Sequence, residues 1–134
     1  MHQSIINLNN IQNSIKEILE KKNNIKIIAV SKTFPINHIS PLIEYGHLDF
    51  GENKVQEAIE KWTNIKMKNK NISLHLVGKL QSNKTKTALK IFDYIHSLDT
   101  EKLANKISEE QKGMAKKPKL FIQVNIGNED QKSG

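Results

Sequence analysis

Hydrophobic residues recur along the chain with two spacings, one typical of helices and one typical of buried strands. In residues 4–21 the isoleucines and leucines lie mostly three or four positions apart, with polar residues between them, which predicts an amphipathic helix. Residues 25–30 follow as a nearly continuous run of branched apolar residues. Such a run predicts a strand that is buried on both faces, as in a parallel sheet.

The two spacings keep alternating toward the C-terminus. Further strands are predicted at 47–50, 72–78, 93–98 and 119–126, and helices at 36–46, 51–62, 81–92 and 99–113. Pro41 conflicts with a helix that begins at Ile36, so the start of that helix stays open. The predicted helix caps are Asn53 or Glu52, Ser82 or Asn83, and Asp99 at N-termini, with Gly46 and Gly113 at C-termini.

Strands that alternate with helices in this way must be parallel and joined by crossover helices. Two architectures fit, an open doubly wound sheet and a (β/α)8 barrel. The first turn after a strand, SKTFP at 31–35, lacks the glycine-rich phosphate fingerprint, which weakens the dinucleotide-binding version of the open sheet. Eight units of the observed length need roughly 200 residues, so a barrel built by this chain would be unfinished.

The composition is that of a soluble globular protein with one domain. The chain has 134 residues, of which 37% are hydrophobic and 26% charged, enough for a real core. It has no cysteine, which excludes disulfides and thiolate metal sites and makes a cytoplasmic location the default. It has neither an apolar run that could cross a membrane nor an N-terminus of the secretory type.

The net charge of +7 raises the question of nucleic-acid binding. The chain is also rich in Ile, Asn and Lys, the bias that an AT-rich genome imposes on any protein. Its lysines are scattered, and the densest group, Lys66, Lys68 and Lys70, has no neighbouring aromatic residue in sequence. We therefore do not expect nucleic acid as a partner.

Polar residues gather just after the predicted strands, at the ends that surround the binding site in α/β proteins. They include Ser31, Lys32, Glu52, Asn53, Lys79, Gln81, Ser82, Asn83, Ser97, Asp99 and Asn125. This concentration of amides and charges predicts a site for a polar small molecule. Metal-ligand spacing, a hydrolytic carboxylate pair and a serine between elbow glycines are all missing from the sequence.

Lys32 is the strongest single feature, because it lies two residues after a strand that is predicted to be buried. A lysine held at the mouth of an apolar barrel is partly desolvated, and its amine can then attack an aldehyde to form a Schiff base. Pyridoxal phosphate is the commonest protein-bound aldehyde of this kind. Position alone favours the simpler interpretation, a lysine that extends into solvent.

Four separated motifs change that balance: AVSKTFP, DFGENKVQEAIEKW, HLVGKLQSNK and VNIGNEDQKSG. Together they resemble the YggS/PROSC family of pyridoxal-phosphate-binding proteins, also called PLP homeostasis proteins, which is similar to the N-terminal barrel of alanine racemase. The resemblance runs from about residue 25 to the last residue. It implies an α/β fold of the (β/α)8 TIM-barrel type, truncated after about the fifth strand and preceded by an extra N-terminal helix.

The resemblance also implies the cofactor, pyridoxal 5'-phosphate, and its anchor, since the family lysine that matches Lys32 carries it as a Schiff base. Asn53 is then either a hydrogen-bond partner near the cofactor ring or a helix cap. His75 is expected inside the barrel, as a satisfied interior histidine rather than a proton donor. The expected cofactor-binding residues are thus Lys32, Asn53 and His75, with Gly78 allowing a close backbone approach. No catalytic or metal residue is expected.

Family members continue beyond this length, and their later strands supply a phosphate-binding loop with an arginine. This chain contains no arginine. We therefore expect residues 1–134 to form a partial barrel domain, a fragment that binds pyridoxal phosphate weakly on its own. The oligomeric state stays open, a monomer being one outcome for the full-length protein.

The function that follows is a non-catalytic carrier in intracellular PLP homeostasis. The alternative is a racemase of the alanine-racemase type, which needs a second acid/base group on the opposite face of the cofactor. Tyr45 and Tyr94 fall at a helix end and a strand start, positions that suit this role poorly.

Overall fold

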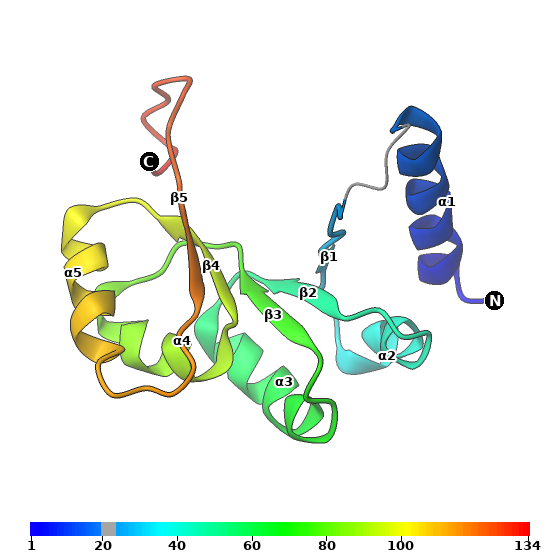
Figure 1. Cartoon of the computed structure of the whole chain (residues 1–134), viewed down its shortest axis with the longest axis horizontal. Helices are drawn as coiled ribbons and strands as arrows, with labels where there is room; N and C mark the ends of the chain where they lie inside the picture. Colours follow the sequence, from blue (N-terminus) through cyan, green and yellow to red (C-terminus); the bar gives the residue numbers. More distant parts are fainter. Residues whose placement is uncertain (20–23) are drawn as a thin grey trace.

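The computed structural model describes residues 1–19 and 24–134, drawn in Figure 1. Helices and strands alternate, as predicted. The elements are α1 (Gln3–Ile18), β1 (Ala29–Val30), α2 (Ile36–Glu44), β2 (Asp49–Glu52), α3 (Val55–Lys68), β3 (Ser73–Leu76), a 3-10 turn η1 (Ser82–Lys84), α4 (Thr85–Ile91), β4 (Tyr94–Leu98), α5 (Glu101–Glu110) and β5 (Lys119–Ile122). The predicted first helix matches α1, and the part of it at residues 20–21 lies outside the described residues.

The five strands form one parallel sheet in the order β1-β2-β3-β4-β5, so each strand pairs with the next along the chain. Helices α3, α4 and α5 line one side of this sheet (Figure 1). Among the described residues β1 and β5 are its two edges and do not pair with each other, so the sheet is not closed into a barrel.

Four strands, β1, β3, β4 and β5, are shorter than predicted, and the two edge strands β1 and β5 fall short by the most residues. β1 covers only two residues because β2 begins at Asp49, which leaves residues 25–27 without a strand partner. Val30 is 48% exposed, so the prediction of burial on both faces is wrong for this strand. β5 ends at Ile122 rather than at residue 126, and all of its residues are exposed.

Helix α2 runs through Pro41 from a start at Ile36, the start that the proline had left in doubt. A proline cannot donate to the carbonyl four residues before it, here that of Asn37. The Ser40 hydroxyl supplies the missing bond, since Ser40 Oγ donates to Asn37 O at 3.3 Å. Gly46 directly follows the C-cap of α2 at φ +96°, as predicted for a C-terminal glycine. Gly113 also has a positive φ, +77°, but α5 already ends at Glu110 with Gln111 as its C-cap, so the predicted end of this helix is wrong.

The predicted N-caps are wrong. Lys54 caps α3, without a side-chain hydrogen bond, because Glu52 is the last residue of β2 and bonds elsewhere. Thr100, not Asp99, caps α5, and its Oγ1 accepts from Leu103 N at 3.1 Å. Helix α4 begins at Thr85 after the 3-10 turn, and neither Ser82 nor Asn83 caps it.

The core lies between the sheet and the helices. Its fully buried side chains include Phe50, Trp62, Leu74, Leu76 and Ile95. The rings of Phe50 on β2 and Trp62 on α3 pack with centroids 4.8 Å apart. Since strand side chains alternate between faces, the neighbours of these core residues point to the side of the sheet away from α3–α5. No helix within the described residues is long and apolar enough to cross a membrane.

Candidate functional site

Lys32 lies two residues beyond the end of β1, in a turn at the carboxyl edge of the sheet. Its side chain is exposed. Within the described residues, its amine makes neither a hydrogen bond nor an ion pair. An amine in this condition is free to take a ligand.

The residues on both sides of Lys32 are firmly held. Ser31 is buried, and its amide donates to the carbonyl of Gly51 at 2.8 Å. The amide of Thr33 donates to Glu57 Oε1 at 2.6 Å, and Thr33 adopts a positive φ of 66° that few threonines adopt. The turn therefore presents Lys32 from a fixed backbone.

The buried carboxylate of Glu52, the last residue of β2, contacts this turn through Ser31. Its Oε1 accepts hydrogen bonds from Ser31 Oγ at 2.8 Å, Lys61 Nζ at 2.9 Å and Trp62 Nε1 at 2.8 Å. The Glu52 side chain is 0% exposed, and its Oε2 has no hydrogen-bond partner among the described residues. A buried carboxylate is stable only when cations and donors compensate for its lost hydration, so all three donors matter.

Lys61 of α3 connects this carboxylate to the turn. Besides Glu52, its amine donates to the carbonyl of Ser31 at 2.8 Å and to Glu57 Oε1 at 3.2 Å. The hydrogen bond from the Thr33 amide, aided by Lys61, holds the pKa of Glu57 below its usual value. Lys61 thus links the carbonyl of Ser31, at the start of the turn, to Glu52 of β2, while Glu57 of α3 holds the amide of Thr33.

Asn53 is half-buried at the same edge, directly after β2. Its close neighbour is Gly78, where an added Cβ would overlap both the carbonyl oxygen and the side-chain Oδ1 of Asn53. The predicted close approach at Gly78 is confirmed, and the predicted helix-cap role of Asn53 is wrong. A cavity of about 360 Å³ opens here, lined by Asn53, Lys54, Val55, Gln56, Lys79, Gln81 and Lys84.

His75 points to the face of the sheet away from α3–α5. Its Nε2 lies 2.9 Å from Asp49 Oδ1, its Nδ1 lies 2.9 Å from His96 Nε2, and its ring stacks on Tyr94 at 4.2 Å. Burial lowers the pKa of His75, despite the opposing effect of Asp49. These are the contacts of a satisfied interior histidine, as predicted. Within the described residues no hydrogen bond joins His75 to Lys32 or Asn53.

The sequence reasoning missed the network around Glu52. Glu52 was predicted only as a possible helix cap, and neither Lys61 nor Trp62 was identified as its partner. Two signals were available: a glutamate as the final residue of a buried strand, and the i,i+4 pair Glu57 and Lys61 on α3. No group of acidic and histidine side chains within the described residues could hold a metal ion.

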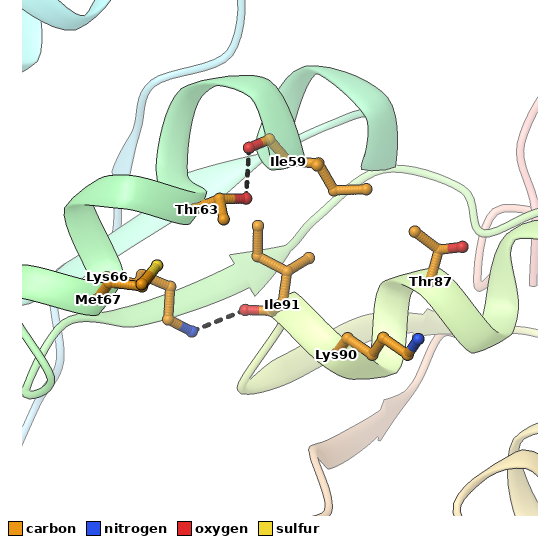
Figure 2. A pocket seen from close by; sticks show the side chains of 7 residues that line it. All are labelled: Ile59, Thr63, Lys66, Met67, Thr87, Lys90 and Ile91. Atoms are coloured by element: carbon orange, nitrogen blue, oxygen red, sulfur yellow. Dashed lines mark hydrogen bonds between the residues drawn. The ribbon is translucent and has the colours of Figure 1, made fainter.

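A second cavity, of about 400 Å³, lies between α3 and α4, remote from these strand ends (Figure 2). Its lining is Ile59, Thr63, Lys66, Met67, Thr87, Lys90 and Ile91. In Figure 2 the amine of Lys66 reaches the carbonyl of Ile91, at 2.7 Å, and so joins the two helices. This cavity contains none of the predicted site residues.

Curated proteins that share one name match almost the whole of this chain. The pyridoxal phosphate homeostasis protein of Pasteurella multocida is 39% identical over 125 residues, which are 93% of this chain and 54% of that protein. That of Haemophilus influenzae is 39% identical over 132 residues, 96% of this chain and 56% of that protein. The chain is homologous to the pyridoxal phosphate homeostasis proteins. It spans about half the length of these relatives, and no protein-family model matches it.

The homology extends to solved structures. PipY of Synechococcus elongatus without PLP matches with a TM-score of 0.79 and 36% identity, over 92% of this chain and 56% of that one. PipY with PLP bound matches with a TM-score of 0.74 and 36% identity, over 86% and 53%. The resemblance drawn from the four motifs is confirmed, as is the α/β fold with a parallel sheet.

Proposed function

We propose that the protein is a pyridoxal 5'-phosphate-binding protein of cytoplasmic PLP homeostasis, which holds the cofactor as a Schiff base on Lys32 without catalysing a reaction. The observation that carries the proposal is the condition of Lys32. Its amine is exposed and without a partner among the described residues, on a turn whose flanking residues are fixed. The relatives named for PLP homeostasis and the PLP-bound PipY structure support the choice of aldehyde.

The residues present fit the aldehyde end of the cofactor. When bound, pyridoxal phosphate supplies an aldehyde that condenses with a primary amine. Lys32 provides such an amine at the carboxyl edge of a parallel sheet, where α/β proteins bind ligands. Asn53, half-buried at the same edge, would hydrogen-bond near the ring, and His75 would shape the interior below it.

The residues present fit the phosphate end less well. Arginine pairs with phosphate by two parallel hydrogen bonds, and the chain contains none. Residues 1–134 are proposed to be a partial barrel domain, and their affinity for the cofactor is proposed to rest on Lys32 alone. A monomer is proposed as the state of the full-length protein.

The chain's two tyrosines give a racemase no support. Tyr45 OH donates to Asn9 Oδ1 of α1 at 3.0 Å, and the Tyr94 ring is stacked on His75. Each tyrosine is engaged away from the turn that holds Lys32. A racemisation assay with alanine that gave Lys32-dependent turnover would replace the carrier function with the enzymatic one.

The direct test is covalent mapping of the adduct. The chain is incubated with pyridoxal phosphate, reduced with borohydride and digested, and the modified lysines are identified by mass spectrometry. We expect modification to concentrate on Lys32, to be lost in Lys32→Ala and to persist in Lys86→Ala, an exposed lysine of α4. Modification spread evenly over the lysines would contradict the proposal.

A further inference from the structure

We propose that Lys61 and Glu52 are positioning residues, which fix the turn from which Lys32 meets its aldehyde ligand. The inference rests on the proposed function, because it assigns Lys32 as the reacting amine. It concerns residues that touch the backbone around Lys32 and not Lys32 itself. They act through the turn, so their loss should alter how selectively Lys32 reacts.

The turn needs this support because its strand is weak. β1 has two residues, lies at the sheet edge and pairs only with β2. The residue before the turn, Val30, is about half exposed, so little apolar packing holds it. Ladder hydrogen bonds from one side alone leave an edge strand free to fray.

Polar contacts take the place of that packing. Around Lys32 the carbonyl of Ser31 accepts from Lys61, the hydroxyl of Ser31 donates to Glu52, and the amide of Thr33 donates to Glu57. All three partners belong to β2 or α3. Lys32 is the only residue of the segment 31–33 for which no such bond is present among the described residues.

The same geometry separates the roles of two nearby lysines. The Lys61 side chain is 9% exposed, and its three donors are matched by three acceptors, Ser31 O, Glu52 Oε1 and Glu57 Oε1. A fully paired, buried ammonium is a poor nucleophile, whereas the exposed amine of Lys32 is available. Lys61 therefore has a structural role in this proposal, and Lys32 is the amine that reacts with the ligand.

Glu52 indicates that this arrangement is not optimised for stability alone. Its Oε2 is buried without a partner among the described residues, a costly condition for a carboxylate oxygen. Its other oxygen, Oε1, holds three donors in one place: Ser31 Oγ, Lys61 Nζ and Trp62 Nε1.

The test compares Lys61→Met with Lys66→Met. Both lysines lie on α3, and each bridges a carboxylate and a backbone carbonyl, Lys61 beside the turn and Lys66 far from it. The readout is the ratio of borohydride-trapped adduct on Lys32 to the average on the other lysines. It is measured under conditions where circular dichroism shows every variant folded.

We expect Lys61→Met to lower this ratio about tenfold, the factor for one lost hydrogen bond to a charged group. Lys66→Met should leave it unchanged. Lys61→Arg, whose guanidinium can still donate to the same acceptors, should restore most of the ratio. A cofactor held in one orientation also shows induced circular dichroism in the visible range. This signal should be weaker in Lys61→Met than in Lys61→Arg and Lys66→Met, and a loss of stability alone does not produce that ranking.

Should Lys61→Met fail to fold, Glu57→Ala keeps Lys61 on Glu52 and on the carbonyl of Ser31. It removes the bonds that Glu57 accepts from the Thr33 amide and from Lys61, at a side chain that is 29% exposed. Its control is Glu60→Ala, exposed on the same helix. Equal ratios in the test and control variants would overturn the positioning role. A wild-type ratio near one, with the total trapped adduct unchanged in Lys32→Ala, would instead overturn the proposed function, so the two failures are distinguishable.

Discussion

Two lysines of helix α3, Lys61 and Lys66, make the same kind of contacts at opposite edges of the sheet. At the carboxyl edge of the sheet Lys61 donates to Glu52 and to the carbonyl of Ser31. At the amino edge Lys66 donates to Asp93 and to the carbonyl of Ile91. In each case one lysine joins the helix to a carboxylate and a backbone carbonyl.

The difference lies in how completely each carboxylate is satisfied. Both oxygens of Asp93 have partners: Oδ1 accepts from Lys116 at 2.7 Å, and Oδ2 accepts from Lys66 and from the amide of Leu74. Glu52 crowds three donors onto one oxygen and leaves the other without a partner in the described part of the chain. In (β/α)8 barrels the amino edge of the sheet serves stability and the carboxyl edge carries the active site, and the roles proposed for the two networks follow that division.

The largest effect is expected at the amino edge. Asp93→Ala leaves Lys66 and the amide of Leu74 without their partner, which should lower the free energy of unfolding by about 3 to 5 kcal/mol. Urea denaturation measures this loss. In the fraction that stays folded, the selectivity of adduct formation at Lys32 should not change. A folded Asp93→Ala protein with reduced selectivity of adduct formation at Lys32 would show that the amino-edge network also affects Lys32. The proposed difference between the two edges would then be wrong.

A smaller effect is expected from Gly78→Ala at the carboxyl edge. The new methyl group would meet the carbonyl oxygen and Oδ1 of Asn53, so the backbone must shift, at a cost of about 1–3 kcal/mol. Gly127→Ala is the control, since a Cβ there meets only the flexible side chain of Glu129. Equal denaturation midpoints for the two variants would show that the close approach of Asn53 and Gly78 carries no constraint.

These features also separate what the sequence could predict from what it could not. The alternation of helices and strands followed from local hydrophobic spacing, and the C-terminal glycine of α2, Gly46, followed from local backbone geometry. The length of β1 did not, because it depends on where β2 begins, a property of register between segments.

The candidate site divides in the same way. The role proposed for Lys32 came from the four motifs and not from its position, which alone favoured a lysine in solvent. The inward direction of His75 was predictable because side chains alternate along its strand. The part played by Glu52 was not predictable, since its three donors come from the β1 turn and from α3. The preference for polar and acidic residues at helix N-termini predicted that Glu52 could cap α3. In the structure Glu52 instead accepts hydrogen bonds from Lys61 and Trp62.

Ser31→Ala provides a milder probe of the carboxyl edge. It removes one of the three donors to Glu52 but keeps Lys61 and Trp62 in place. The free energy of unfolding should fall by about 1 kcal/mol, with a measurable loss of adduct selectivity at Lys32. Ser14→Ala, which removes an exposed hydroxyl bonded within α1, is the matched control. Selectivity that falls equally in both variants would contradict a specific role for the Glu52 network.

The smallest effect is expected from a change of pH. It should act on stability through His75, which belongs to neither the Lys61 nor the Lys66 network. Burial holds the pKa of His75 below its ordinary value of 6.5 despite Asp49, with Lys26 adding to the lowering, and burial also lowers that of the adjoining His96. The unfolded chain therefore binds more protons than the folded one as pH falls below about 6.5, and stability should decrease there.

The carboxylates of the two edges respond only in more acidic solution. The pKa of Glu57 is held below 4.5 by the Thr33 amide and Lys61, and that of Asp93 below 3.8 by its lysines despite burial. Their contributions are present above these values and are lost as pH falls through the lowered ones. Between neutral pH and about pH 5, His75→Gln should therefore flatten the pH dependence of the urea midpoint, while Lys61→Met and Lys66→Met should leave its slope unchanged. A His75→Gln protein that keeps the wild-type slope would show that another group titrates in this range.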